Sequence, residues 1–245
     1  MDEPKDETRN TRNKEEIVRA GVTGRPTTRR RQGMTDSLSD ESRRRVERAT
    51  VHLVEKGGQG VLVPGAILLS ATHCIAWSGT GMMALGEVYP TEIETPSGVE
   101  FRVGVDACDP VADIAALGEL DNQQCPDDAD RFEEWREQVE PVPLSYRRIK
   151  PGQVEPVFIY THKGEWIAGS VTRYGYDKPY SSVALFVERI ESGTSGSPVV
   201  TADGLLLGIV SNGSGSRNPD VPSSTMPVCV MALPRWVLER IHHSK

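Results

Sequence analysis

The alternation of apolar and polar residues changes character near Ala49. Residues 1–48 contain few large apolar side chains and show no sustained helical or strand period. Such a segment cannot bury enough surface to offset the entropy lost on ordering. We therefore expect a disordered charged tail over residues 1–48, with one short helix over residues 40–48 leading into the folded part.

From Ala49 onward, short apolar runs alternate with glycine, proline and polar turns, which is typical of an antiparallel all-β domain. The first group of predicted strands covers residues 49–55, 60–63, 66–71, 87–95, 99–105 and 114–117. The second group covers residues 156–161, 166–174, 183–190, 198–201, 205–211 and 228–232. The chain thus predicts two successive β-rich halves.

Two segments have helical rather than strand periodicity. Apolar residues recur at helical spacing over residues 127–140, between two prolines, so we expect a helix that connects the two halves. Residues 234–242 begin with a proline, which is compatible with the first turn of a helix, and are expected to form a C-terminal helix.

Charge divides the chain at the same place as the apolar pattern. The net charge of −7 comprises about +3 on residues 1–48 and about −10 on the remainder. The arginine triplets at residues 29–31 and 43–45 raise the possibility of a nucleic-acid-binding arm, but the interspersed acidic residues favour a solvated linker. No apolar run approaches the ~18 residues that a membrane span needs, so we expect no membrane association.

The cysteines and the N-terminus bear on the compartment. The first residues are charged and no apolar stretch follows them, so we expect no export signal and a cytoplasmic protein. The four cysteines Cys74, Cys108, Cys125 and Cys229 are expected to be free thiols, with a Cys108–Cys125 disulfide as the alternative.

Three short segments carry candidate chemistry. They are Ala71-Thr72-His73-Cys74, Asp113-Ile114-Ala115-Ala116-Leu117 and Gly193-Thr194-Ser195-Gly196-Ser197-Pro198. A serine hydroxyl is a weak nucleophile at neutral pH, so it needs a base within hydrogen-bond reach and a third group that orients the base. Histidine, aspartate and serine in this chain order are one known arrangement of such a triad.

These segments resemble the histidine, aspartate and nucleophile segments of trypsin-like (chymotrypsin-fold) serine peptidases, of a bacterial type without an export signal. The run Leu207-Gly208-Ile209-Val210-Ser211-Asn212-Gly213 and the C-terminal helix fit the same pattern, so the resemblance covers about residues 49–241. It implies an all-β peptidase domain over residues 49–245, built from two six-stranded antiparallel β-barrels at about residues 49–120 and 142–232. The active site is expected in the cleft between them.

The resemblance also implies roles. His73 is the expected general base and acid, Asp113 orients it, and Ser195 is the nucleophile. The backbone N–H groups of Gly193 and Ser195 are expected to form an oxyanion hole, where glycine suits the turn at position 193. Ser197 is the rival nucleophile. The mechanism requires no metal or other cofactor, and the histidines and cysteines lack zinc-ligand spacing.

The chain departs from secreted members of this family in its activation features. Thr194 stands where those enzymes carry an aspartate that pairs with a newly freed N-terminal amine, so we expect no zymogen switch of that type. Deletion of residues 1–45 is accordingly expected to leave activity intact. Cys74 has no upstream cysteine with which to form a bracing disulfide.

The expected substrate is a protein or peptide. By resemblance, Arg189 lies at the base of the pocket for the side chain before the cleaved bond, where a guanidinium would favour an acidic residue; alternatively it faces solvent and the preference is for small or aliphatic residues. Ser211, Asn212 and Gly213 are expected to pair their backbone with the substrate.

Two other classes of function are compatible with these residues. The chain could be a catalytically silent or conditionally active peptide-binding module of the same fold, or an esterase that uses the same triad. A peptidase without a zymogen switch also suggests control by a regulatory protein partner.

Overall fold

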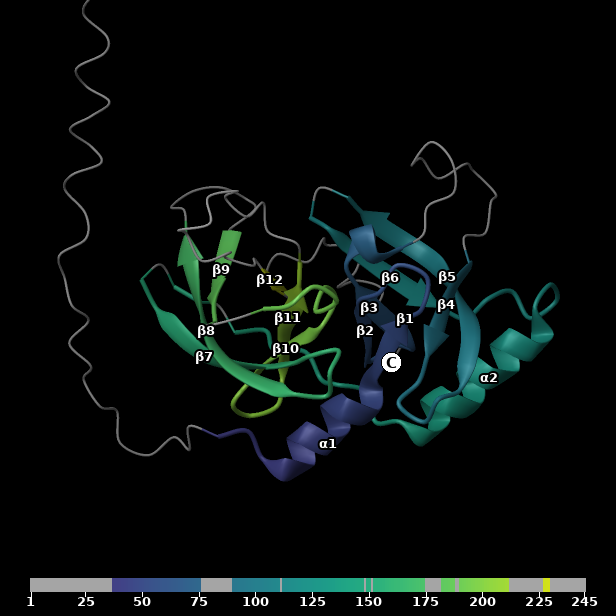
Figure 1. Ribbon diagram of the computed structural model, residues 1–245, viewed down its shortest axis with the longest axis horizontal. Helices are drawn as coiled ribbons and strands as arrows, with labels where there is room; N and C mark the ends of the chain where they lie inside the picture. Colours follow the sequence, from purple (N-terminus) through teal and green to yellow (C-terminus); the bar gives the residue numbers. More distant parts are fainter. Residues whose placement is uncertain are drawn as a thin grey trace, which may run out of the picture. The chain divides into compact units, whose positions relative to one another are not determined.

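The computed structural model describes residues 37–75, 90–110, 112–147, 149–150, 152–174, 182–187, 190–211 and 227–229 (Figure 1). All of them belong to the unit Thr35–Lys245. Most of the expected tail and the expected C-terminal helix lie outside the described residues.

The first half is a closed barrel of six antiparallel strands, as the sequence predicts. The strands are β1 (Thr50–Leu53), β2 (Gln59–Val63), β3 (Ile67–Ser70), β4 (Pro90–Glu94), β5 (Glu100–Asp109) and β6 (Ile114–Gly118), in the spatial order β1-β2-β3-β6-β5-β4. Every residue of β2, β3 and β6 is buried, so these strands are covered on both faces. This explains why they appear in the sequence as continuous apolar runs rather than as alternating ones.

One strand of this barrel is longer than predicted. β5 continues four residues beyond the expected end at Val105. A register shift between Val105 and Ala107 keeps the later residues paired with β6. Such a bulge bends the strand and increases its twist without ending the ladder, which the apolar pattern alone does not reveal.

The second half is a six-stranded antiparallel sheet. Its strands are β7 (Val154–Tyr160), β8 (Trp166–Tyr174), β9 (Ser182–Phe186), β10 (Pro198–Thr201), β11 (Leu206–Val210) and β12 (Pro227–Cys229), in the order β12-β11-β10-β7-β8-β9. The edge strands β9 and β12 approach each other, but among the described residues no backbone ladder joins them. Closure into a second barrel, which requires that ladder, is therefore not confirmed.

The helix between the halves is present as α2 (Pro126–Gln138), with Pro126 in its first turn. Its buried residues Phe132 and Trp135 pack on Phe101 of β5, with ring centroids 6.3 Å apart in both pairs. The helix therefore covers the first barrel as well as connecting the two halves. Among the described residues, no helix is both long and apolar enough to cross a bilayer.

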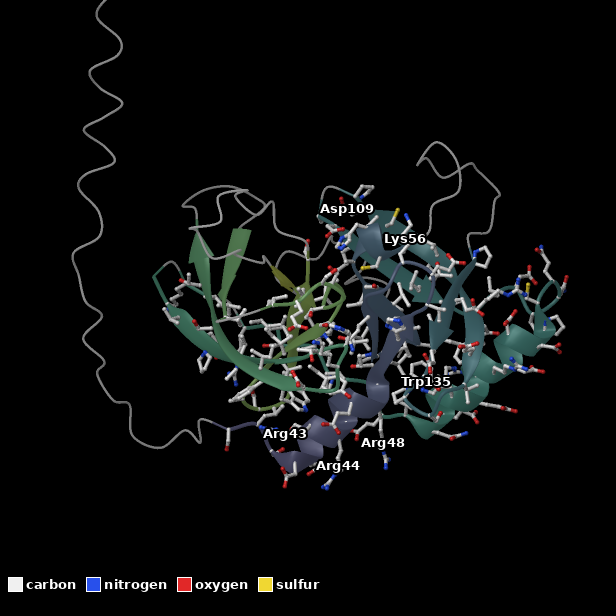
Figure 2. The ribbon with its side chains drawn as sticks, in the orientation of Figure 1. Arg43, Arg44, Arg48, Lys56, Asp109 and Trp135 are labelled. Carbon is white, nitrogen blue, oxygen red and sulfur yellow. The ribbon has the colours of Figure 1, made fainter. Side chains whose placement is uncertain are left out.

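A second helix, α1 (Asp40–Ala49), forms where the sequence predicts a short helix at the end of the tail. Ser39 caps it by accepting a hydrogen bond from the Ser42 N–H, at 3.1 Å. Trp166 of β8 donates its indole N–H to the Glu47 carboxylate at 2.8 Å. Figure 2 shows Arg44 and Arg48, both exposed, pointing away from the strands. The opposite face of the helix is thus part of the folded structure.

This packing changes the expected result of truncation. Leu38, at the entrance to α1, is only 3% exposed. Deleting residues 1–45 removes Leu38 and more than half of α1, so we expect a loss of about 2–3 kcal/mol of stability and a melting temperature lower by about 4–10 °C. Deletion of residues 1–36 is the matched control and is expected to leave the melting temperature unchanged. Equal melting temperatures for both truncations would contradict the packing role of α1.

Candidate active site

His73 and Asp113 are brought together by the pairing of β3 with β6. His73 lies in the short 3-10 helix η1 (Thr72–Cys74) just after β3, and Asp113 immediately precedes β6. The ladder between these strands pairs Ser70 with Ala115. As a result, His73 Nδ1 lies 3.0 Å from Asp113 Oδ1 and 2.9 Å from Oδ2.

The Asp113 carboxylate is fixed by further donors. The His73 backbone N–H donates to Oδ1 at 3.1 Å, and the Ser211 hydroxyl donates to Oδ2. Asp113 itself has φ +55°, in the left-handed region that aspartate adopts more readily than most residues. Because Ser211 follows β11 of the second sheet, both halves of the molecule orient this one carboxylate.

The Ser211 contact was not predicted. The sequence predicts that the Ser211 backbone pairs with a substrate, which stays a prediction, and the structure adds the contact of its side chain with Asp113. No local signal distinguishes this serine from others at strand ends, because the contact depends on residue 113 of the other half.

Ser195 lies in a tight turn before β10. The Thr194 N–H donates to the Glu191 carbonyl at 3.3 Å, and the Ser197 N–H to the Thr194 carbonyl at 3.1 Å. Gly193 has φ +93°, a conformation that side-chain-bearing residues rarely adopt. A turn of this shape is what the glycine at position 193 predicts.

Two N–H groups of this turn have no hydrogen-bond partner among the described residues. Within the described part of the chain, neither the Gly193 N–H nor the Ser195 N–H donates a hydrogen bond. Unpaired amides in a turn with positive φ can bind an anion. The loop therefore has two donors that could bind negative charge near the Ser195 hydroxyl.

The nucleophile candidate is not hydrogen-bonded to the base candidate. In the described residues no hydrogen bond joins Ser195 to His73. The Ser195 side chain instead interacts with the thiol of Cys74, the residue after His73. The structure thus joins His73 to Asp113 and places Ser195 beside the helical turn that carries His73. Among the described residues, the hydrogen bond between Ser195 and His73 is absent.

Gln59 of β2 connects the first barrel to the Ser195 turn. Its backbone N–H donates to the Ser195 carbonyl at 2.8 Å, its side-chain oxygen accepts from the Ser197 hydroxyl, and its carbonyl accepts from the Ser70 hydroxyl at 2.7 Å. Ser197 is 0% exposed, so its hydroxyl is both inaccessible and already engaged. These contacts favour Ser195 over its rival. Gln59 was missed in the sequence, where a lone glutamine beside glycines carries no functional signal.

The Cys74 thiol is buried next to this arrangement. Burial, and secondarily the negative charge of Asp113, raise its pKa to about 12. Cys74 and Cys125 are free thiols, so the alternative Cys108–Cys125 disulfide is not formed. A Cβ at Gly58 would lie 2.6 Å from the Cys74 sulfur, so the thiol occupies the space beside that glycine.

We therefore expect Cys74 to resist alkylation. Thiolate is the reactive form, and a pKa raised to about 12 keeps the Cys74 thiol protonated at neutral and mildly alkaline pH. Iodoacetamide at about pH 8 should modify the more exposed Cys125 in the native protein and modify Cys74 only after denaturation, as read by peptide mass spectrometry. Rapid native labelling of Cys74 would contradict its burial.

The remaining predicted site residues Arg189, Asn212 and Gly213 lie outside the described residues. Among the residues that the structure describes, no cluster of histidine, cysteine, aspartate or glutamate side chains has the arrangement of a metal site.

Comparison with known proteins places the fold. No protein-family model and no curated protein sequence matches the chain. Among solved structures, an inactive mutant form of Rv3671c from M. tuberculosis H37Rv is 15% identical, with a TM-score of 0.53, over 84% of this chain and 91% of that chain. A serine endoprotease from Yersinia pestis is 15% identical, with a TM-score of 0.54, over 87% of this chain and 68% of that chain.

The HtrA-type protease AlgW, solved with a tripeptide, is 17% identical with a TM-score of 0.56. The match covers 83% of this chain and 64% of AlgW, so the chain spans slightly less than two thirds of that protein. These structural similarities show the fold. The chain has the chymotrypsin-type fold of trypsin-like and HtrA-type serine proteases.

Proposed function

We propose that this protein is a serine endopeptidase that cleaves peptide bonds through an acyl-enzyme intermediate. The observation that carries the proposal is the His73 ring held by Asp113, beside a turn that offers Ser195 and two N–H groups without a partner among the described residues. A base with an orienting carboxylate, a hydroxyl and anion-binding amides are the parts that acyl transfer requires.

In the proposed first step, Ser195 Oγ attacks the carbonyl carbon of the scissile bond and His73 Nε2 takes the hydroxyl proton. His73 Nδ1–H donates to Asp113 throughout, which holds the ring in the tautomer with Nε2 free and stabilises the imidazolium. The tetrahedral intermediate collapses as His73 gives its proton to the leaving amine. Water, deprotonated by His73, then attacks the acyl-enzyme and releases the acid product.

Formation of the reactive contact requires a movement of the Ser195 side chain. Its hydroxyl interacts with the Cys74 thiol and must turn toward the His73 ring. Hydrogen bonds between a nucleophile and its base commonly tighten only when substrate binds. Substrate binding is therefore expected to exchange the weak sulfur contact for the hydrogen bond to His73.

The oxyanion of the tetrahedral intermediate is assigned to the N–H groups of Gly193 and Ser195. Loss of one such donor typically costs on the order of 3 kcal/mol of transition-state stabilisation. Because neither amide has another partner in the described residues, no existing hydrogen bond must break when the charge develops.

The substrate preference, the partner and the compartment belong to the proposal. An acidic residue before the cleaved bond, bound by Arg189, remains one hypothesis beside a small or aliphatic preference. A regulatory protein partner and a cytoplasmic location also remain expectations from the sequence. The alternatives, a silent peptide-binding module or an esterase, share the fold and differ in what they do to a peptide bond.

The test is labelling with a fluorophosphonate probe, followed by identification of the modified peptide and by cleavage of a peptide library. The intact protein should be labelled on Ser195, Ser195→Ala should not be labelled, and Ser197→Ala should keep the label if it folds. Labelling without cleavage of any peptide would favour the esterase. A well-folded intact protein that takes no label would favour the silent module.

A further inference from the structure

The turn between β7 and β8, residues 161–165, lies against the turn that carries Ser195. β7 pairs with β10 in antiparallel register, with Ile159 opposite Val199. The turn that follows β7 and the turn that precedes β10 therefore emerge at the same end of the sheet. This β7–β8 turn is named the 161–165 turn below.

The 161–165 turn is held by its own hydrogen bonds. The Thr161 N–H donates to the Glu165 carbonyl at 2.9 Å, and the Gly164 N–H donates to the Thr161 carbonyl at 3.0 Å. The Glu165 N–H donates in turn to the Thr161 hydroxyl oxygen at 3.2 Å. Because these bonds close the turn on itself, it can act as a fixed support for a neighbouring loop.

Two side chains of this turn reach the Ser195 loop. A Cβ placed on Gly193 would lie 3.3 Å from three atoms of the His162 ring, Cγ, Cδ2 and Nδ1, so the ring lies directly beside the Gly193 α-carbon. Lys163 forms an ion pair with Glu191, the residue whose carbonyl accepts from the Thr194 N–H. One contact meets the loop at the glycine of the proposed oxyanion hole, and the other at the start of the turn.

At Thr194 the loop gains no support from its own side chain within the described residues. Thr194 is 1% exposed, and its hydroxyl has no hydrogen-bond partner among the described residues. A pocket of about 210 Å³ lies between this part of the loop and the 161–165 turn, lined by Thr161, His162, Lys163, Glu165, Ile167, Glu191 and Thr194. A loop beside open space can shift toward it, so the contacts on its other atoms decide where the Gly193 and Ser195 amides point.

We propose that His162 and Lys163 are positioning residues that hold the Gly193–Ser195 turn in its oxyanion-binding conformation, an inference that rests on the proposed peptidase function. His162 contributes most, because its ring contacts Gly193 directly. The ion pair contributes less, because the Lys163 side chain is 52% exposed and that of Glu191 is 34% exposed, and such pairs contribute little.

The experiment measures kcat and KM per titrated active site, together with the rate of fluorophosphonate labelling. His162→Ala is expected to lower kcat and the labelling rate about tenfold with little change in KM, because transition-state stabilisation is lost and substrate binding is not. His162→Phe keeps a flat ring beside Gly193 and should restore most of the rate. Lys163→Ala should cost about threefold, while Lys163→Arg and the exposed control Lys150→Ala should retain full rate.

A measurement independent of activity accompanies these rates. In His162→Ala, amide hydrogen exchange in the peptide that contains residues 191–197 should be faster than in the intact protein, and His162→Phe should restore protection. Unchanged exchange and unchanged kcat in His162→Ala would overturn the inference, as would a His162→Phe variant as impaired as His162→Ala. Failure of the peptidase proposal gives a different result, because the folded intact protein then takes no fluorophosphonate label. In that case the hydrogen-exchange data alone test whether His162 positions the turn.

Discussion

Replacing Ser195 with alanine is expected to lower kcat/KM on a cleaved peptide by about five orders of magnitude, with His73→Ala close behind. The reason is that the two residues act as one unit. Without the hydroxyl there is no acyl-enzyme, and without the His73 ring the hydroxyl proton has no acceptor. Asp113 holds the His73 ring at hydrogen-bond distance, so His73→Ala removes a base that is already oriented.

The double variant provides the control. Ser195→Ala combined with His73→Ala should be no slower than either single variant, because the remaining rate comes from binding and the oxyanion hole alone. Asp113→Asn should leave the fold intact and still reduce the rate by about four orders of magnitude, since the amide would favour the wrong His73 tautomer. Additive losses, or substantial turnover by Ser195→Ala, would show that the nucleophile lies elsewhere.

Replacing Gly196 with alanine is expected to have the largest effect on stability. Gly196 has φ +78°, and a Cβ there would lie 1.9 Å from the Gln59 carbonyl oxygen and 2.8 Å from the Ser70 hydroxyl oxygen. The first of these atoms is backbone in a buried strand and cannot move aside cheaply. The left-handed conformation costs about 1 kcal/mol for alanine and overpacking typically costs a further 1–3 kcal/mol, so we expect a loss of about 3 kcal/mol or more.

Gly98→Ala is the matched control, because Gly98 has nearly the same φ, +79°, and nothing within 4 Å of a Cβ. It should lose only the conformational contribution of about 1 kcal/mol. Urea unfolding of both variants, together with fluorophosphonate labelling of the folded fraction, separates the conformational cost from the overpacking cost. Equal destabilisation by Gly196→Ala and Gly98→Ala would mean that the Ser195 turn can move away from Gln59, and that the hydrogen bonds of Gln59 do not fix its position.

Several features could be predicted because their causes are local. The apolar runs of β2, β3 and β6 and the helical spacing of Phe132 and Trp135 depend on residues close in sequence, and the structure places these elements as predicted within a few residues. Positive φ at Gly193 was also predictable, because a turn of this shape excludes most side chains. The all-β class follows from these local patterns, whereas the barrel was implied by the family resemblance.

The sequence by itself determined the strands, the connecting helix and the order of the histidine, aspartate and serine segments, because each depends on residues that are close together in the chain. Only the tertiary structure decided which distant side chains support them: Gln59 on the Ser195 turn, Ser211 on Asp113, and His162 beside Gly193. Each of these contacts joins segments at least 31 residues apart. Contacts of that kind depend on strand register and on the packing of the two halves, and no local pattern of polarity encodes either.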